Sequence, residues 1–166
     1  LARAAGVLAE TNIYFDDTSN ISVTGMKAKL RRVKNLGLVI IDYLQLMQSD
    51  RKTENRVQEV SDISRGLKLM AKEFEVPVIT CAQLSRSSEK ENKRPVLSDL
   101  RDSGAIEQDA DTVMFLTRDY YKGDPEKENI ADCIIAKNRH GATGTATLGW
   151  YGQFTKFITI DKEHES

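Results

Sequence analysis

The chain has 166 residues, of which 40% are hydrophobic and 30% are charged, a composition that fits one globular domain and excludes a disordered or collagen-like chain. Its formal net charge of −1 provides no overall basic field, so any nucleic-acid site must be a local patch. No apolar run approaches the length of a membrane span, no signal peptide opens the chain, and the two cysteines lack metal-ligand spacing. We therefore expect a cytoplasmic protein with free thiols. Because the chain opens mid-pattern without a start Met, we also expect a fragment of something longer.

The first part of the chain predicts helices and one short strand. Residues 1–9 are typical of the end of a helix, and residues 12–15 can form a strand. Apolar side chains then recur at helical spacing between residues 23 and 33. Lysines and arginines at residues 27–34 fill much of the opposite face. We interpret this basic face as solvated, with nucleic acid or a partner protein as the alternative.

Residues 38–47, LVIIDYLQLM, are the most informative stretch. The continuous apolar run at residues 38–41 predicts a strand buried on both faces, and the run ends in Asp42. Proteins of the α/β class bind ligands at the carboxyl edge of the sheet, and P-loop folds place the acid that holds Mg²⁺ there. The alternative is an aspartate that merely ends a strand.

The middle of the chain continues the alternation of strands and helices. An amphipathic helix is predicted at residues 57–74, a strand at 76–83 and a third buried strand at 112–117. This order is typical of a parallel α/β sheet. Because one helix joins the first two strands, a right-handed crossover should place Asp42 and Gln83 at the same edge. The Gln83 amide could hydrogen-bond a phosphate oxygen or an attacking water there.

The end of the chain is rich in β-forming residues. Segments 130–138, 143–151 and 156–160 are separated by glycine-containing turns and predict antiparallel hairpins at the edge of the sheet. The predicted fold is therefore α/β, a mostly parallel sheet with C-terminal antiparallel hairpins.

A long polar region follows the second strand. Residues 84–95 and 98–111 are expected to form loops, and structureless loops of this size are uncommon unless they are functional. Gly104 permits a close backbone approach, and Arg101 could contact phosphate. The alternative is a polar connection between two strands.

Two cations lie in the turn after residue 136. Lys137 and Arg139 are two positions apart, so they share a face in an extended chain. Such a pair could reach an anion on a neighbouring molecule, as an arginine finger does in phosphoryl transfer. The adjacent His140 is expected to be structural or solvated.

Four segments occur in a specific order: IIDYLQLM, QLSR, KRPVLSDLRDSGAIEQDAD and KNRHGATGT. Over nearly the whole chain this pattern resembles the C-terminal motor domain of the bacterial replicative DNA helicase, the DnaB family. The resemblance implies a RecA-like fold, a homo-hexameric ring around single-stranded DNA, and ATP hydrolysis between subunits that drives translocation and unwinding of duplex at the fork. It also implies a primase and a helicase loader as partners.

The resemblance also implies roles for individual residues. Asp42 resembles the Walker B acid that orders Mg²⁺ through water, and Gln83 resembles the residue that senses the γ-phosphate of ATP. Arg139 resembles the arginine finger, with Lys137 beside it, and both would serve the neighbouring subunit's site.

A further motif resembles the loop that holds the DNA backbone. It comprises Arg101, Asp102 and Gly104, and a backbone contact of this kind ignores base sequence. The mild departures from the family pattern are Ala82, where Ser is frequent, and Asp102, where Glu is frequent.

The larger departure is a missing motif. No G-x-x-x-x-G-K-[ST] sequence occurs in the chain, and the family's catalytic glutamate is also missing. Residues 1–166 are thus expected to be the C-terminal part of a single RecA-like motor domain, with an incomplete site for ATP and Mg²⁺ and no activity alone. Removing the upstream strands should uncover apolar strand faces and edges, leaving the chain marginally stable or self-associating.

Two other interpretations remain at this point. The chain could be a non-catalytic interaction module for a loader, primase or ring neighbour, with the helices at residues 27–34 and 54–75 as surfaces. It could also be a related RecA-like recombinase or clock-type ring protein. That class is not expected to carry both SDLRDSGAIEQDAD and KNRHGATGT.

Overall fold

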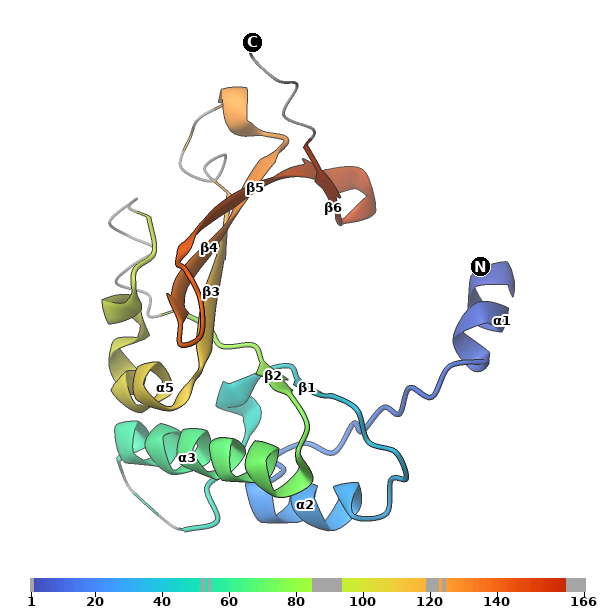
Figure 1. The fold of residues 1–166 in the computed structure, drawn as a ribbon, viewed down its shortest axis with the longest axis vertical. Helices are drawn as coiled ribbons and strands as arrows, with labels where there is room; N and C mark the ends of the chain where they lie inside the picture. The colour runs from blue at the N-terminus through green and yellow to red at the C-terminus, as the bar shows by residue number, and fades with distance from the viewer. Residues whose placement is uncertain are drawn as a thin grey trace.

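The structure is a computed structural model that describes residues 2–51, 53, 55–84, 94–118, 123 and 125–160, with the backbone alone at residues 2–4, 101–103 and 126. Figure 1 shows helices below and beside a long, curved antiparallel sheet, with the N-terminal helix standing apart on an extended linker. The elements, in chain order, are α1 (Ala2–Ala9), α2 (Val23–Leu30), β1 (Val39–Ile41), η1 (Leu44–Leu46), α3 (Arg56–Phe74), β2 (Val78–Thr80), η2 (Leu97–Ser103), α5 (Gly104–Asp109), β3 (Thr112–Thr117), η4 (Pro125–Lys127), β4 (Ile130–Asn138), β5 (Gly144–Tyr151), η5 (Gly152–Phe154) and β6 (Lys156–Thr159).

Strands β1 and β2 form a parallel pair joined by α3. The register pairs Val39 with Val78 and Ile41 with Thr80, so both strands end at the same edge. Only one face of the pair is covered, because Val39 and Ile41 are buried whereas Ile40 is 65% exposed. The expectation of a strand buried on both faces is therefore wrong for this chain, since nothing in its described residues covers the second face.

Strands β3 to β6 form an antiparallel sheet in chain order. The predicted hairpins are confirmed by the pairing of β4 with β5 and of β5 with β6. Within the described residues, β3 pairs with β4 and not with the parallel strands. It was expected to be fully buried, but Val113 and Phe115 face the core while Met114 and Leu116 are exposed.

Helix α3 is the centre of the hydrophobic core. Its apolar stripe includes Ile63 and Met70, both fully buried. A Cβ atom added at Gly66 would lie 3.1 Å from Cγ2 of Val23, so α2 packs closely against this helix. On another side α3 packs against η2 and α5. The three helices predicted at residues 1–9, 23–33 and 57–74 are confirmed.

Two predicted elements differ from the structure. Residues 12–15 form no strand but an extended linker, on which Phe15 is 95% exposed. Residues 98–111 are largely helical rather than a loop, since they contain most of η2 and all of α5. Apolar Leu100 and Ile106 anchor these two short elements in the core. Most of the predicted loop at residues 84–95 lies outside the described residues.

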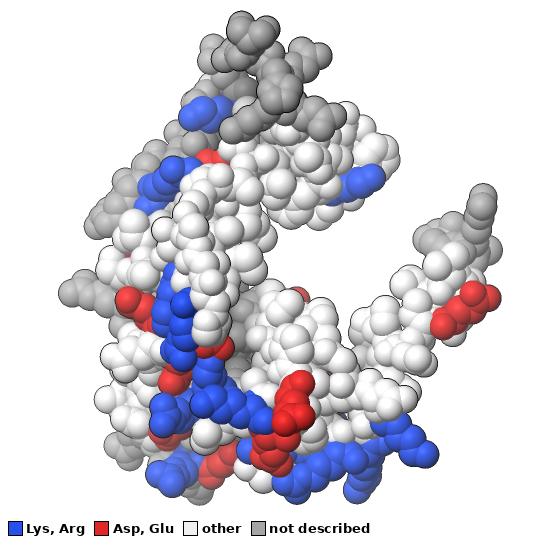
Figure 2. Space-filling model, in the orientation of Figure 1, with Lys and Arg blue, Asp and Glu red and all other residues white. Residues whose placement is uncertain are grey.

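Charge is distributed unevenly over the face drawn in Figure 2. Lys, Arg, Asp and Glu gather in the lower part of the view, over the helices, whereas the hollow between the antiparallel sheet and the N-terminal arm is lined mostly by other residues. Of the helices in the described part of the chain, none is long and apolar enough to cross a membrane.

Candidate nucleotide site at the edge of the parallel strands

The parallel pairing brings Asp42 and Gln83 to one edge of the sheet, as the sequence predicts. The Cys81 N–H donates to the Ile41 carbonyl over 2.9 Å, and the Leu44 N–H donates to the Cys81 carbonyl over 2.9 Å. These bonds extend the strand pairing past the last residues of β1 and β2. Both Asp42 and Gln83 are exposed, so their polar groups are available to a ligand.

Gln45 is a residue of this edge for which the sequence predicted no role. It lies in the one-turn helix η1, three positions after Asp42, and its side-chain amide meets the backbone of Gln83. Its Nε2 donates to the Gln83 carbonyl over 3.1 Å, and its Oε1 accepts from the Gln83 N–H over 3.3 Å. The only sequence signal was its place in the LQLM segment.

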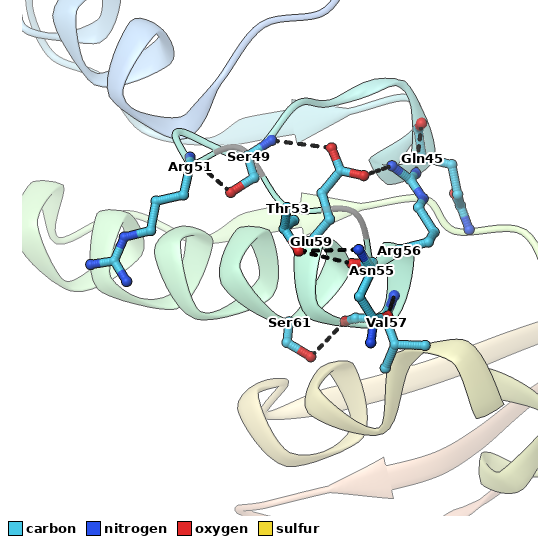
Figure 3. Close-up of polar contacts among 9 residues, drawn as sticks. All are labelled: Gln45, Ser49, Arg51, Thr53, Asn55, Arg56, Val57, Glu59 and Ser61. Carbon is cyan, nitrogen blue, oxygen red and sulfur yellow. Dashed lines mark hydrogen bonds and ion pairs between the residues drawn. The ribbon is translucent and has the colours of Figure 1, made fainter.

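A polar network links this edge to the start of α3 (Figure 3). Arg56 donates from Nη2 to the Gln45 carbonyl over 2.9 Å and pairs with the Glu59 carboxylate over 2.5 Å. Glu59 also accepts from the Ser49 N–H over 3.4 Å. Asn55 caps the helix by accepting from the Val57 N–H over 2.9 Å. The chain between β1 and α3 is thereby tied to the helix at several points.

Asp42 is the residue of this edge that could hold Mg²⁺ through water. Its carboxylate makes no hydrogen bond or ion pair with the described residues and is exposed beyond the end of β1. Mg²⁺ in nucleotide sites keeps several waters and uses one or two carboxylates together with the phosphates. In the part of the chain that the structure describes, no group of three or more His, Cys, Asp or Glu side chains could hold a metal by itself.

The cation pair Lys137 and Arg139 lies elsewhere, at the junction of α5 and β4. Lys137 donates to the Glu107 carbonyl over 2.5 Å, and both cations approach the Gln108 carbonyl, Lys137 at 3.4 Å and Arg139 at 3.5 Å. The two side chains thus share a face, as their spacing predicts. They meet the C-terminal end of α5, where the helix carbonyls attract positive charge.

Asp111 holds Arg139, a role that the sequence did not indicate. Its Oδ1 lies 3.2 Å from Nε of Arg139, and its Oδ2 accepts a very close hydrogen bond from Lys68 of α3. The hydrogen bond from Lys68, with added attraction from Lys68 and Arg139, lowers the pKa of Asp111 below its ordinary value of 3.8. Arg139 nevertheless remains 46% exposed at its side chain, so it is not buried within its own subunit.

The candidate DNA segment is described in part. Arg101 and Asp102 lie in η2, but their side chains fall outside the described residues. Gly104 begins α5 with a helical φ of −50°, so its backbone does not need glycine's freedom, and no atom lies within 4 Å of an added Cβ. Asp99 is buried and accepts from the Val96 N–H over 2.8 Å, which closes the start of η2.

The basic face of α2 is used within the chain. Lys27 and Arg31 pair with Glu73 of α3 over 2.8 and 2.9 Å, and Lys29 pairs with Asp16 over 2.8 Å. These contacts join α2 to α3 and to the N-terminal linker. Much of the basic face is therefore explained by ion pairs within the chain, and no nucleic acid or partner protein is needed to explain it.

Comparison with known proteins gives the class and then the family. A solved structure described as an ATPase domain superposes with a TM-score of 0.90 and 42% identity, covering 96% of this chain and 59% of that one. A second, "The Structure Of A DnaB-Like Replicative Helicase And Its Interactions With Primase", has a TM-score of 0.90 and 42% identity and covers 97% of this chain and 41% of that one. The fold is therefore that of part of a DnaB-like α/β ATPase domain, the class predicted from the sequence. In the described residues, however, the antiparallel strands form a four-stranded sheet separate from the parallel pair β1 and β2.

The family follows from the sequence match. Residues 1–159 match the family described as "DnaB-like helicase C terminal domain". The chain is 52% identical over 171 residues to the replicative DNA helicase DnaB of Geobacillus stearothermophilus and 49% identical over 171 residues to the replicative DNA helicase DnaC of Bacillus subtilis. This chain belongs to the DnaB-like helicase C-terminal domain family, so the resemblance is confirmed. Both matches include 99% of this chain, and the chain spans 38% of the length of each of these two relatives.

Proposed function

We propose that this chain is the C-terminal part of the motor domain of an ATP-dependent replicative DNA helicase, which translocates on single-stranded DNA and unwinds duplex at the fork. The observation that carries the proposal is the shared edge of β1 and β2, where a carboxylate and an exposed amide, both without partners among the described residues, follow the ends of adjacent parallel strands. Family membership over residues 1–159 supports it. Replication in bacteria takes place in the cytoplasm, where we place the protein.

In this proposal Asp42 and Gln83 serve one nucleotide. Asp42 would hold Mg²⁺ through water, and the bound ion neutralises charge on the phosphates of ATP. Gln83 would hydrogen-bond the γ-phosphate and report whether it is present. The phosphate-cradling loop and the catalytic glutamate would come from the part of the protein upstream of this chain.

The cation pair would serve a different nucleotide. Lys137 and Arg139 meet the end of α5 rather than the edge that carries Asp42, and Arg139 is half exposed. We infer that Arg139 acts as an arginine finger for the neighbouring protomer of a homo-hexameric ring, with Lys137 beside it. A guanidinium matches a phosphate in a planar, bidentate geometry, and its charge persists at any working pH.

Arg101, Asp102 and Gly104 would hold the sugar-phosphate backbone of single-stranded DNA from η2 and the start of α5. Primase and a helicase loader are further proposed partners, and the relative solved with primase supports the first of them. The packing of η2 and α5 against α3 connects this segment to the helix that follows the nucleotide edge.

The exposed apolar faces of β1, β2 and β3 support the proposal that further residues of the complete protein pack on these strands. Ile40, Ile79, Met114 and Leu116 are between 47% and 65% exposed, although they lie on strands beside the core. Faces of this kind are covered in α/β proteins. We infer that upstream residues of the complete protein cover them.

The proposal is tested with the complete protein carrying Asp42→Asn. The amide removes the charge that orders Mg²⁺, so DNA-stimulated ATP hydrolysis should fall by about a hundredfold or more while the ring still assembles. Hydrolysis is measured by phosphate release and assembly by light scattering. Turnover within about twofold of that of the unsubstituted protein would contradict the assignment.

A further inference from the structure

We propose that Gln45 is a positioning residue that fixes the orientation of Gln83 relative to Asp42; this inference rests on the proposed function of that edge. The Gln45 side-chain amide makes two hydrogen bonds to the backbone of Gln83, one to its carbonyl and one from its N–H. A neighbouring β-strand satisfies backbone groups in the same way. Gln45 thus extends the pairing beyond the last residue of β2.

Gln45 is itself held from two sides. In η1, its neighbour Leu44 is 1% exposed and donates its backbone N–H to the Cys81 carbonyl. On the other side, the Gln45 carbonyl accepts from Arg56 at the start of α3. The backbone that carries the Gln45 side-chain amide is therefore held in place, and Asp42 lies three positions before Gln45 on the same short segment.

This arrangement leaves the Gln83 side chain available. Because Gln45 binds only the backbone of Gln83, the exposed Gln83 amide makes no hydrogen bond with the described residues. Without the Gln45 contacts, the Gln83 backbone would lose its two hydrogen bonds with Gln45, and the spacing between the sensing amide and the Asp42 carboxylate would vary. A misplacement of about 1 Å at a reacting centre can cost about a hundredfold in rate.

The chemistry of the contact requires glutamine. Glutamate at this position keeps the length but loses the donor to the Gln83 carbonyl and places an anion against it. Alanine removes both bonds. Neither variant changes Asp42, Gln83 or the core residues around η1.

The test uses the complete protein with Gln45→Ala, Gln45→Glu, Gln83→Ala and the double variant. Each Gln45 variant should lower the kcat of DNA-stimulated ATP hydrolysis about tenfold, with a KM for ATP within about threefold of normal. The double variant Gln45→Ala/Gln83→Ala should be no slower than Gln83→Ala alone, because a positioning residue has nothing left to position. Gln48→Ala is the matched control. Its exposed side chain makes no hydrogen bond with the described residues, and it should leave kcat unchanged.

A second measurement does not depend on catalysis. Hydrogen exchange at the backbone N–H of Gln83, measured in the same complete protein, should be about tenfold faster in Gln45→Ala and Gln45→Glu than in Gln48→Ala. Normal kcat in both Gln45 variants, a double variant that loses the product of the two single effects, or unchanged exchange at Gln83 would overturn the inference. If Asp42→Asn and Gln83→Ala both keep full turnover while exchange at Gln83 still responds to Gln45, the proposed function fails and the positioning contact stands.

Discussion

Asp111 joins three elements through one carboxylate. It follows α5, binds Lys68 of α3 and pairs with Arg139 after β4. Lys68 is only 19% exposed at its side chain, so its ammonium group needs this partner. The low pKa of Asp111 means that the folded chain prefers the charged carboxylate more strongly than the unfolded chain does.

This preference predicts a pH dependence of stability. Because the folded pKa is lowered, the Lys68 pair stabilises the fold above the ordinary value of 3.8 and loses this effect as the pH falls through the lowered value. Lys68→Met should lower the midpoint temperature of thermal unfolding. The decrease should be largest above about pH 5 and should become smaller as the pH is lowered toward about 3. Lys72→Met, at an exposed position of the same helix, is the matched control and should show no such dependence. A Lys68→Met effect that is equal at both pH values would remove Asp111 as its cause.

Some of the site residues could be predicted from the sequence and others could not. Asp42 and Gln83 follow apolar strands, so strand order and crossover handedness are enough to place them together. Gln45 and Asp111 act through the path of their side chains across space, to residues 38 and 43 positions away. A single sequence contains no signal for such contacts.

The local patterns predicted most of the helices and strands within a few residues, and β3 and β4 have the predicted bounds. The periodicity of residues 57–74 predicted α3 within a residue at its start. A strand needs a partner, and the described residues contain none for segment 12–15. In segment 98–111, serine, aspartate and glycine suggested a loop. However, Leu100 and Ile106 have core positions, and Asp99 accepts from the N–H of Val96, the residue just before η2.

The start of α3 offers a test at the same scale. Asn55 accepts from the Val57 N–H, so Asn55→Ala should leave that donor without a partner and lower the free energy of unfolding by about 1 kcal/mol. Asn55→Asp keeps the acceptor and should have a much smaller effect. Chemical denaturation of the three proteins measures the differences. A loss of the same size in both variants would show that the cap is not responsible.

At the scale of the whole molecule, the two sheets and the N-terminal linker carry apolar side chains that no other described residue covers. Ile40, Met114 and Phe15 are exposed on three different parts of the chain. Uncovered apolar strand faces were expected from the sequence, and the exposure of Ile40 and Met114 agrees with that expectation. Marginal stability or self-association of the isolated chain, and its lack of ATP hydrolysis, stay predictions.

The proposed mechanism requires each nucleotide to be shared between two protomers, with Asp42 from one and Arg139 from the next. The most direct measurement mixes complete proteins that carry Asp42→Asn with complete proteins that carry Arg139→Ala and follows ATP hydrolysis. Each variant alone lacks one half of every site. In mixed rings, an Arg139→Ala protomer supplies Asp42, and an adjacent Asp42→Asn protomer supplies Arg139.

A parallel mixture of unsubstituted and Asp42→Asn proteins is the control, since it shows whether rings with some inactive sites still turn over. We predict that the mixture of the two variants hydrolyses ATP faster than either variant alone, with the highest rate near equal proportions. A mixture no faster than the sum of the two variants, while the control mixture remains active, would contradict the shared site.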